Sequence, residues 1–193
     1  MQMAQYFKTL DVSSIAFEPL RKDGRIYAAP LKNGPIRIQT PPVLIKSTVE
    51  GVAWLAPTGP FQKFLSDVEA HLQHKAREDA VSWGLQEDQV ATSFKSFFRA
   101  EDGAFKVRMH PEFAAFSPEG ELIEESEEFK DTTARLLVEL DKLSIGKTEM
   151  GGLWRVIQLR VTSPPPPCLI DFDVEVPDDD EEAAQENDDD EFV

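Results

Sequence analysis

The sequence lacks the features by which secreted domains and membrane proteins are recognised. Its 193 residues include one cysteine, Cys168, which excludes an internal disulfide and a metal site built from several cysteines. No apolar run approaches the roughly 20 residues that cross a bilayer. The opening stretch MQMAQYFKTL has no signal-peptide pattern. We therefore expect a soluble, intracellular protein with no membrane contact.

Motifs that bind phosphates or carry nucleophiles are also missing. There is no GxxxxGK followed by Ser or Thr, no GxGxxG after a strand and no GxSxG. The triplet Gly146, Lys147 and Thr148 has neither the upstream glycine nor the following helix of a phosphate loop. His71 and His74 lie three residues apart without a third ligand, so surface histidines are the better interpretation. No enzyme, cofactor or metal site is expected.

Basic residues are absent from the C-terminal part of the chain, where the last of them is Arg160. Thirteen of the 36 acidic residues follow residue 170, so residues 1–170 carry a net charge of −3 although the whole chain carries −16. A nearly neutral body leaves room for a local basic face. The overall acidity therefore does not argue against a nucleic-acid partner.

Residues 178–193 form an acidic tail, DDDEEAAQENDDDEFV, in which ten of the sixteen residues are acidic and none is basic. This composition buries too little apolar surface to offset the entropy of ordering, which predicts disorder. Most acidic termini only keep a protein soluble. This one is a flexible polyanion with an aromatic ring near its end, so it resembles a strand of nucleic acid. We therefore expect the tail to compete with nucleic acid for a cationic groove. Docking elements for a partner are predicted at Phe172 and at Asp188, Asp189, Asp190, Glu191 and Phe192.

The rest of the chain, up to residue 163, is predicted to be one domain of short strands. Alternating apolar and polar residues are interrupted by Gly, Pro and Asp-Gly turns, which is typical of a barrel or sandwich. Strands are expected at residues 14–20, 25–29, 36–39, 43–45, 49–55, 93–99, 105–109, 113–116, 121–123, 134–144 and 153–161. One amphipathic helix is expected over residues 60–83, from the spacing of Phe61, Phe64, Leu65, Val68, Leu72 and Ala76.

Aromatic and basic residues interleave on two of the expected strands: Lys95, Phe97, Phe98 and Arg99, then Lys106 and Arg108. Because alternate residues of a strand share a face, Lys106 and Arg108 should point away from a core that contains Phe105 and Val107. Rings that stack on bases and cations that pair with phosphates hold single strands without reading their sequence. On pattern alone, a half-buried hairpin with a solvated charged face is the more common explanation.

The last two expected strands leave the same choice open. Trp154 alternates with Val156 and Gln158, Arg155 takes the opposite face, and the connecting loop carries Lys147. Trp154 could stack on a base, although tryptophan in a strand is more often a core residue. Trp54 has the same ambiguity.

The stretch ARLLVELDKLSIGKTEMGGLWRVIQLRV resembles the closing strands of the single-stranded-DNA-binding proteins of nucleocytoplasmic large DNA viruses, which are related to those of short-tailed phages. In that family a glycine loop leads into a W-x-V-x-Q-x-x-V strand. The matching residues here are Gly151, Gly152, Trp154, Val156, Gln158 and Val161. FKVRMHPEFAAFSPEGELI, IRIQTPPVLI and the acidic tail are further points of resemblance, which covers residues 36–193 with gaps.

The resemblance implies an OB-type fold, a five-stranded Greek-key barrel that binds nucleic acid on one face. It also implies sequence-tolerant, non-catalytic binding of single-stranded DNA in viral DNA replication, repair or recombination, in the host cytoplasm or nucleus. The tail would compete for the DNA groove and recruit replication proteins such as a polymerase, helicase or primase. A homodimer is left open.

Together these observations predict a mainly β, OB-like barrel over residues 1–163 with one inserted amphipathic helix, followed by a Pro-rich linker and disordered acidic tail over residues 164–193. Contacts to the DNA backbone are expected from Lys95, Arg99, Lys106, Arg108, Lys147 and Arg155, and stacking from Phe97, Phe98 and Trp154. The alternative is an acidic-tailed interaction protein, a virion component or a chaperone for basic partners, that does not bind DNA.

Overall fold

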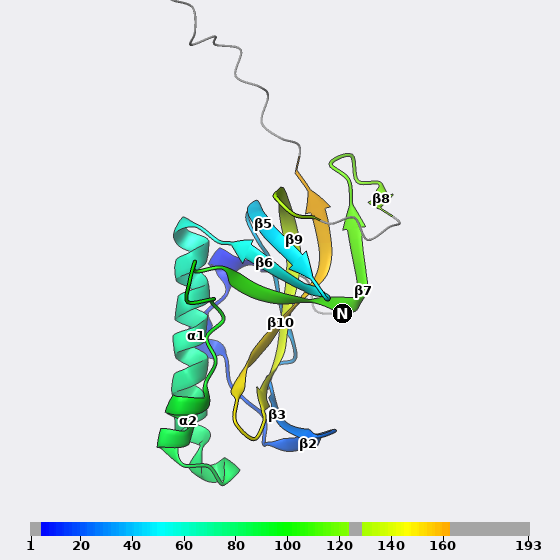
Figure 1. Cartoon of the computed structure of the whole chain (residues 1–193). Coiled ribbons are helices and arrows are strands. Elements are labelled where there is room, and N and C mark those ends of the chain that lie inside the picture. The colour runs from blue at the N-terminus through cyan, green and yellow to red at the C-terminus, as the bar shows by residue number, and fades with distance from the viewer. Residues whose placement is uncertain (1–4, 124–128, 163–193) are drawn as a thin grey trace, which may run out of the picture. The chain divides into compact units, whose positions relative to one another are not determined.

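The centre of the structure is a closed barrel of five strands (Figure 1). The computed structural model describes residues 5–123 and 129–162. The barrel strands are β5 (Val43–Val49), β6 (Val52–Ala56), β7 (Phe105–Phe116), β9 (Thr132–Ile145) and β10 (Met150–Val161). The predicted linker and tail at 164–193, with their docking residues, lie outside the described residues and stay predictions.

The order of strands around the barrel is that of a Greek key. β5, β6 and β7 pair consecutively and antiparallel, and β9 returns to pair with β5. β10 then closes the ring between β9, antiparallel to it, and β7, parallel to it. The prediction of a mainly β, OB-like barrel is confirmed.

Five shorter strands extend this barrel: β1 (Gln5–Tyr6), β2 (Arg21–Asp23), β3 (Ile26–Pro30), β4 (Ile36–Gln39) and β8 (Leu122–Ile123). β4 and β5 both pair with β9. β5 pairs with residues 132–134 of that strand and β4 with residues 137–140. β3 pairs with the last residues of β9, and β2 folds back on β3. The β2–β3 hairpin therefore continues the sheet beyond the barrel.

The strand predicted at residues 14–20 is wrong. Two short 3₁₀ helices, η1 (Phe7–Thr9) and η2 (Val12–Ser14), precede it, and only an isolated bridge joins Phe17 to Leu31. The Asp11 side chain accepts a hydrogen bond from the Ser13 N–H at 3.0 Å. Local side-chain bonds of this kind compete with strand pairing.

Helix α1 (Gly59–Asp79) confirms the predicted amphipathic helix. Its buried residues are the six that recur at helical spacing in the sequence: Phe61, Phe64, Leu65, Val68, Leu72 and Ala76. The helix ends before residue 83, and a 3₁₀ turn, η3 (Val81–Trp83), continues to Gly84. Gly84 has a φ of 73°, which glycine adopts without strain. No helix in the described part of the chain is long and apolar enough to span a membrane.

The strand predicted at residues 93–99 is also wrong, because helix α2 (Glu87–Ser93) occupies its beginning. The Gln86 and Gln89 side chains cap this helix reciprocally. Residues after it run as an irregular segment with isolated bridges from Phe94 to Met150 and from Phe98 to Phe105. Glu69 of α1 accepts hydrogen bonds from the Phe97 N–H and from the Ser96 hydroxyl. A carboxylate on the helix thus replaces the strand partner that the pattern implied.

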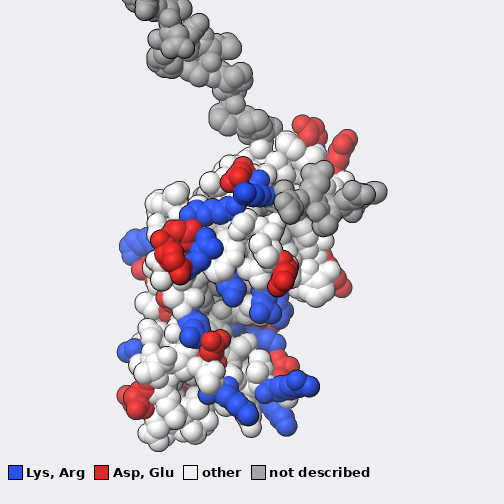
Figure 2. All heavy atoms as spheres, viewed as in Figure 1, with Lys and Arg blue, Asp and Glu red and all other residues white. Residues whose placement is uncertain are grey.

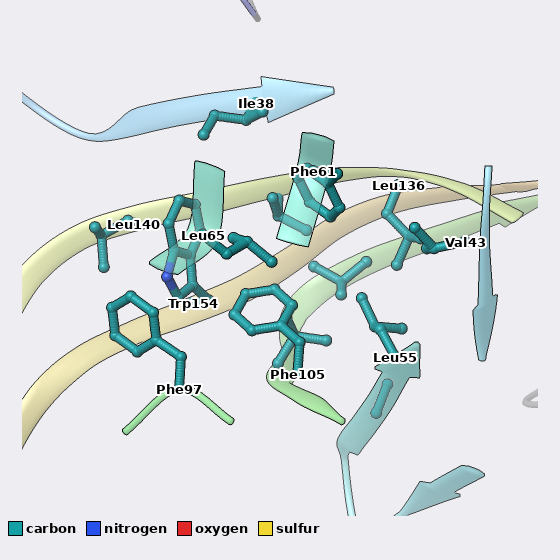
Figure 3. Packing of buried hydrophobic residues seen from close by; sticks show 14 of the residues in the cluster. Ile38, Val43, Leu55, Phe61, Leu65, Phe97, Phe105, Leu136, Leu140 and Trp154 are labelled. Carbon is teal, nitrogen blue, oxygen red and sulfur yellow. The ribbon is translucent and has the colours of Figure 1, made fainter. Parts of the chain in front are cut away.

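Aromatic rings fill the barrel interior (Figure 3). The Trp154 ring meets Phe97 and Phe105 edge-on, with centroids 6.2 and 6.0 Å away. Leu65 and Phe61 of α1 belong to the same core.

The alternation of inward-facing and outward-facing side chains along β10 shifts at one residue. Ile157 is a bulge relative to both neighbouring strands, so Gln158 is exposed while Leu159 is buried. The sequence had placed Gln158 on the same face as Trp154 and Val156, and this is corrected. Because of the bulge, Arg155 and Arg160 both point outward.

Candidate nucleic-acid interface

A groove of about 480 Å³ crosses the outer face of the sheet where β10 begins. Its floor is formed by Gly151, Gly152 and Leu153 of β10. The irregular segment after α2 contributes Lys95 and Ser96 along it, and Ile26 of β3 reaches it from the hairpin. The groove brings together five of the predicted site residues: Lys95, Phe97, Lys106, Arg108 and Trp154.

The two glycines allow the irregular segment to lie directly on β10. The Lys95 N–H donates to the Met150 carbonyl at 2.8 Å. A Cβ on Gly151 would lie 3.3 Å from the Lys95 carbonyl oxygen, and one on Gly152 would lie 3.1 Å from a Phe97 ring carbon. A side chain at Gly151 would press on the Lys95 backbone and one at Gly152 on the Phe97 ring, so the glycines allow the segment to pack against β10.

Three cations face this groove with little compensating charge. Lys95 lies 3.5 Å from Glu149, in a pair whose side chains are both mostly exposed. Neither Lys106 nor Arg108 forms an ion pair with any residue of 5–123 or 129–162. Lys147 is exposed in the adjoining β9–β10 loop. Figure 2 shows Lys and Arg gathered over the lower half of this face, where the β9–β10 and β2–β3 hairpins lie.

Trp54 supplies a half-exposed ring beside these cations. It lies directly opposite Lys106 across the β6–β7 pair. The Arg99 guanidinium carbon is 4.6 Å from the centroid of the ring, and the Lys106 ammonium is 5.7 Å from it. Both cations are within the range of cation–π attraction. The sequence left Trp54 open between a stacking residue and a core residue, and it was not among the residues chosen for the site.

Arg99 is less available than its neighbours because Asp102 binds it with two hydrogen bonds, at 2.8 and 2.7 Å. Lys46 also binds Asp102, at 2.8 Å. Hydrogen bonds from Arg99 and then Lys46 hold the pKa of Asp102 well below its usual range. The same contact raises the pKa of Arg99. Asp102 therefore stays ionised and offsets the charge of Arg99.

Arg155 belongs to a row of charges that crosses the sheet. It lies opposite Arg108 on β7 and opposite Glu139 on β9, and Glu139 in turn lies opposite Arg37 on β4. Arg155 is 3.3 Å from Asp141, and Arg37 is bonded to Glu139 at 2.8 Å. Arg155 is thus partly compensated, whereas Arg108 is not.

The rings predicted to stack are placed differently from the expectation. Phe97 is 4 % exposed and Trp154 is 1 % exposed, so neither has a face open to a nucleotide. Phe98 is half-buried, with its ring 6.0 Å from that of Phe105. The reason is local for Trp154: Arg155 points outward, and the preceding residue of a strand must point inward.

The β2–β3 hairpin is a second feature that the sequence did not single out. Arg21, Lys22 and Arg25 are exposed on it, and Tyr27 is 51 % exposed. No strand was expected between residues 20 and 25, whereas β2 covers Arg21–Asp23 before the chain reverses at Gly24. The hairpin borders the groove through Ile26.

Two histidines of α1 contact other groups of the protein. The His71 ring nitrogen Nε2 lies 2.8 Å from the Ile15 carbonyl oxygen, and His74 lies 3.2 Å from Glu78. Within residues 5–123 and 129–162 no three potential ligands are grouped for a metal ion.

No protein-family description matches the sequence, and no curated protein matches it. The solved structures similar to this chain include three of the single-stranded DNA-binding protein from bacteriophage Enc34. The C-terminal truncation has a TM-score of 0.45 at 10% identity, over 78% of this chain and 97% of that one. The untruncated protein has a TM-score of 0.43 at 11% identity, over 83% of this chain and 96% of that one. Its complex with ssDNA has a TM-score of 0.44 at 9% identity, over 79% of this chain and 98% of that one.

Proposed function

We propose that this protein binds single-stranded DNA without catalysis and without reading its sequence. The observation that carries the proposal is the groove on the outer face of the barrel, where Lys106 and Arg108 are unpaired among the described residues beside the half-exposed ring of Trp54. Cations that follow a backbone, next to a ring on which a base can stack, are the two elements of sequence-tolerant single-strand binding.

Each group has a separate role in this proposal. Lys95, Lys106, Arg108 and Lys147 bind phosphates. Trp54 stacks on a base, with Phe98 beside the groove as a weaker candidate. Arg99 and Arg155 contribute where their acidic partners, Asp102 and Asp141, are displaced by phosphate.

The acidic tail has a regulatory part in the proposal. Residues 178–193 carry ten acidic residues and can occupy the cationic groove in place of DNA. When DNA displaces them, Phe172, Asp188, Asp189, Asp190, Glu191 and Phe192 become available to a polymerase, helicase or primase. The protein would then serve viral DNA replication, repair or recombination.

The test is binding of fluorescent oligo-dT to the full-length protein and to residues 1–170 across a salt series. Tail removal should tighten binding most at low salt, because the competition is electrostatic. Replacement of Lys106 and Arg108 by Ala should lower the slope of log K against log salt by about 1.4, at about 0.7 per phosphate contact. Lys8 and Lys130, which are exposed and do not line the groove, provide the matched double variant.

Absence of binding by both forms would overturn the proposal and favour an acidic-tailed interaction protein for basic partners. Equal losses in the groove variant and in the Lys8 and Lys130 variant would show binding by overall charge, and would remove the groove from the proposal.

A further inference from the structure

Two arginines face each other at the other end of β10 without a compensating acid. Arg160 lies directly opposite Arg135 across the antiparallel β9–β10 pair. Side chains in this relation have Cβ atoms about 5 Å apart, and like charges placed so repel each other. Within residues 5–123 and 129–162 neither arginine forms an ion pair. The fold therefore keeps two like charges close together on the surface of the sheet.

The surroundings of the pair fit a phosphodiester. A groove of about 350 Å³ lies over the two arginines. Gln39 and Gln158 line it with exposed amides, and half-buried Phe116 lies opposite Arg160 on β7. Guanidinium groups bind phosphate with two parallel hydrogen bonds, and a ring edge can support a sugar or base.

Arg160 is held in place without losing its charge. Its Nη2 donates to the Pro118 carbonyl oxygen at 2.6 Å. A neutral carbonyl orients the guanidinium but leaves the positive charge and the remaining N–H donors free. Arg135 is exposed. One fixed and one adjustable guanidinium therefore meet over the same groove.

We infer that the pair Arg135 and Arg160 forms a second phosphate site for the same DNA strand, which runs along the outer face of β10. The inference rests on the proposed function. Gly152 and Arg160 are eight residues apart on β10, which is about 26 Å at a strand rise of about 3.3 Å. At about 3.4 Å per nucleotide in a stacked strand, both grooves are filled by about eight nucleotides. Between them, Arg155 and Gln158 face outward along the same path.

The test compares a short and a long oligonucleotide on the full-length protein. Oligo-dT of about 4 nucleotides is too short to fill both grooves, and one of about 16 nucleotides fills both. Arg135→Glu should weaken binding of the long oligonucleotide by about 25-fold at about 0.1 M salt, because one contact is lost and one repulsion is added. It should leave binding of the short one within about twofold.

The same substitution separates a binding role from a structural one. Arg135→Glu would replace the repulsive cross-strand pair with Arg160 by an attractive one, so the melting temperature should rise while long-strand binding falls. If Arg135 instead had a structural role, the substitution would lower both the melting temperature and the affinity for the long oligonucleotide. The control is Lys8→Glu, which makes the same change in net charge on an exposed residue outside both grooves and should change neither binding nor the length dependence.

Three results would overturn this inference while the proposed function stands: no loss with Arg135→Glu, an equal loss on both oligonucleotides, or the same loss with Lys8→Glu. Failure of the unsubstituted protein to bind either oligonucleotide would instead overturn the proposed function, and the second site with it.

Discussion

Replacement of Trp54 separates stacking from charge in the groove. The ring is half-exposed, with Arg99 and Lys106 within 4.6 and 5.7 Å of its centroid. Stacking of one base on an aromatic ring contributes about 1–3 kcal/mol by alanine substitution. Trp54→Ala should therefore weaken oligo-dT binding by about 5- to 150-fold, with the slope of log K against log salt unchanged, since no cation is removed.

Intrinsic fluorescence gives a direct assay for this contact. The chain has three tryptophans, of which Trp154 is 1 % exposed; Trp83 is half-buried like Trp54, but it lies in η3 and packs on Phe17, with ring centroids 5.7 Å apart. Quenching by DNA should therefore come from Trp54. Trp54→Phe should abolish the quenching while costing only about threefold in affinity, because a ring is retained. Trp83→Phe is the matched control and should leave the quenching intact.

Two results would refute the stacking argument. One is quenching that persists in Trp54→Phe. The other is an unchanged affinity in Trp54→Ala, measured on protein whose melting temperature shows that it is folded. Either would mean that the strand follows the cations without touching the ring, and the path of the DNA would then lie closer to β10 than to β6.

Two further substitutions test the walls of the groove. Gly152→Ala should cost about 1–3 kcal/mol in urea unfolding, because the new Cβ would lie 3.0 Å from Leu140 Cδ1 and 3.1 Å from a Phe97 ring carbon; an unchanged midpoint would mean that the segment after α2 does not rest on this floor. Asp102→Asn should free the charge of Arg99 and tighten oligo-dT binding about fivefold at about 0.1 M salt, and an affinity that stays constant would exclude Arg99 from the interface.

Long, regular elements were predictable from the sequence because their patterns repeat. The helix was located by six apolar residues, and all six are buried in α1. The two longest expected strands, 134–144 and 153–161, correspond to β9 and β10; β9 begins two residues earlier and ends one residue later than expected, and β10 begins three residues earlier. Burial of Phe105 and Val107 with exposure of Lys106 and Arg108 also follows the predicted alternation.

The segment at 93–99 was not predictable from local pattern. Its phenylalanines and bases alternate as a strand would, but α2 takes its first residue and Glu69, 28 residues earlier, binds the Phe97 N–H. The outward position of Trp54 could not be predicted either, for a different reason. Every residue of β6 is apolar, so alternation carries no information about which ones face outward. Trp154 could have been assigned correctly, since the adjacent arginine already marks the outer face.

The barrel closes only after its last two strands, β9 and β10, have been translated. β10 joins β7 to β9, and β9 is what closes back on β5. Until residues 132–161 have been made, β5, β6 and β7 form an open meander with two unpaired edges, and Phe105 lacks the ring of Trp154. Such edges pair readily with other chains. A nascent chain that stops short of β10 therefore exposes the unpaired edges of β5 and β7, and we expect it to aggregate more readily than a chain that includes β10.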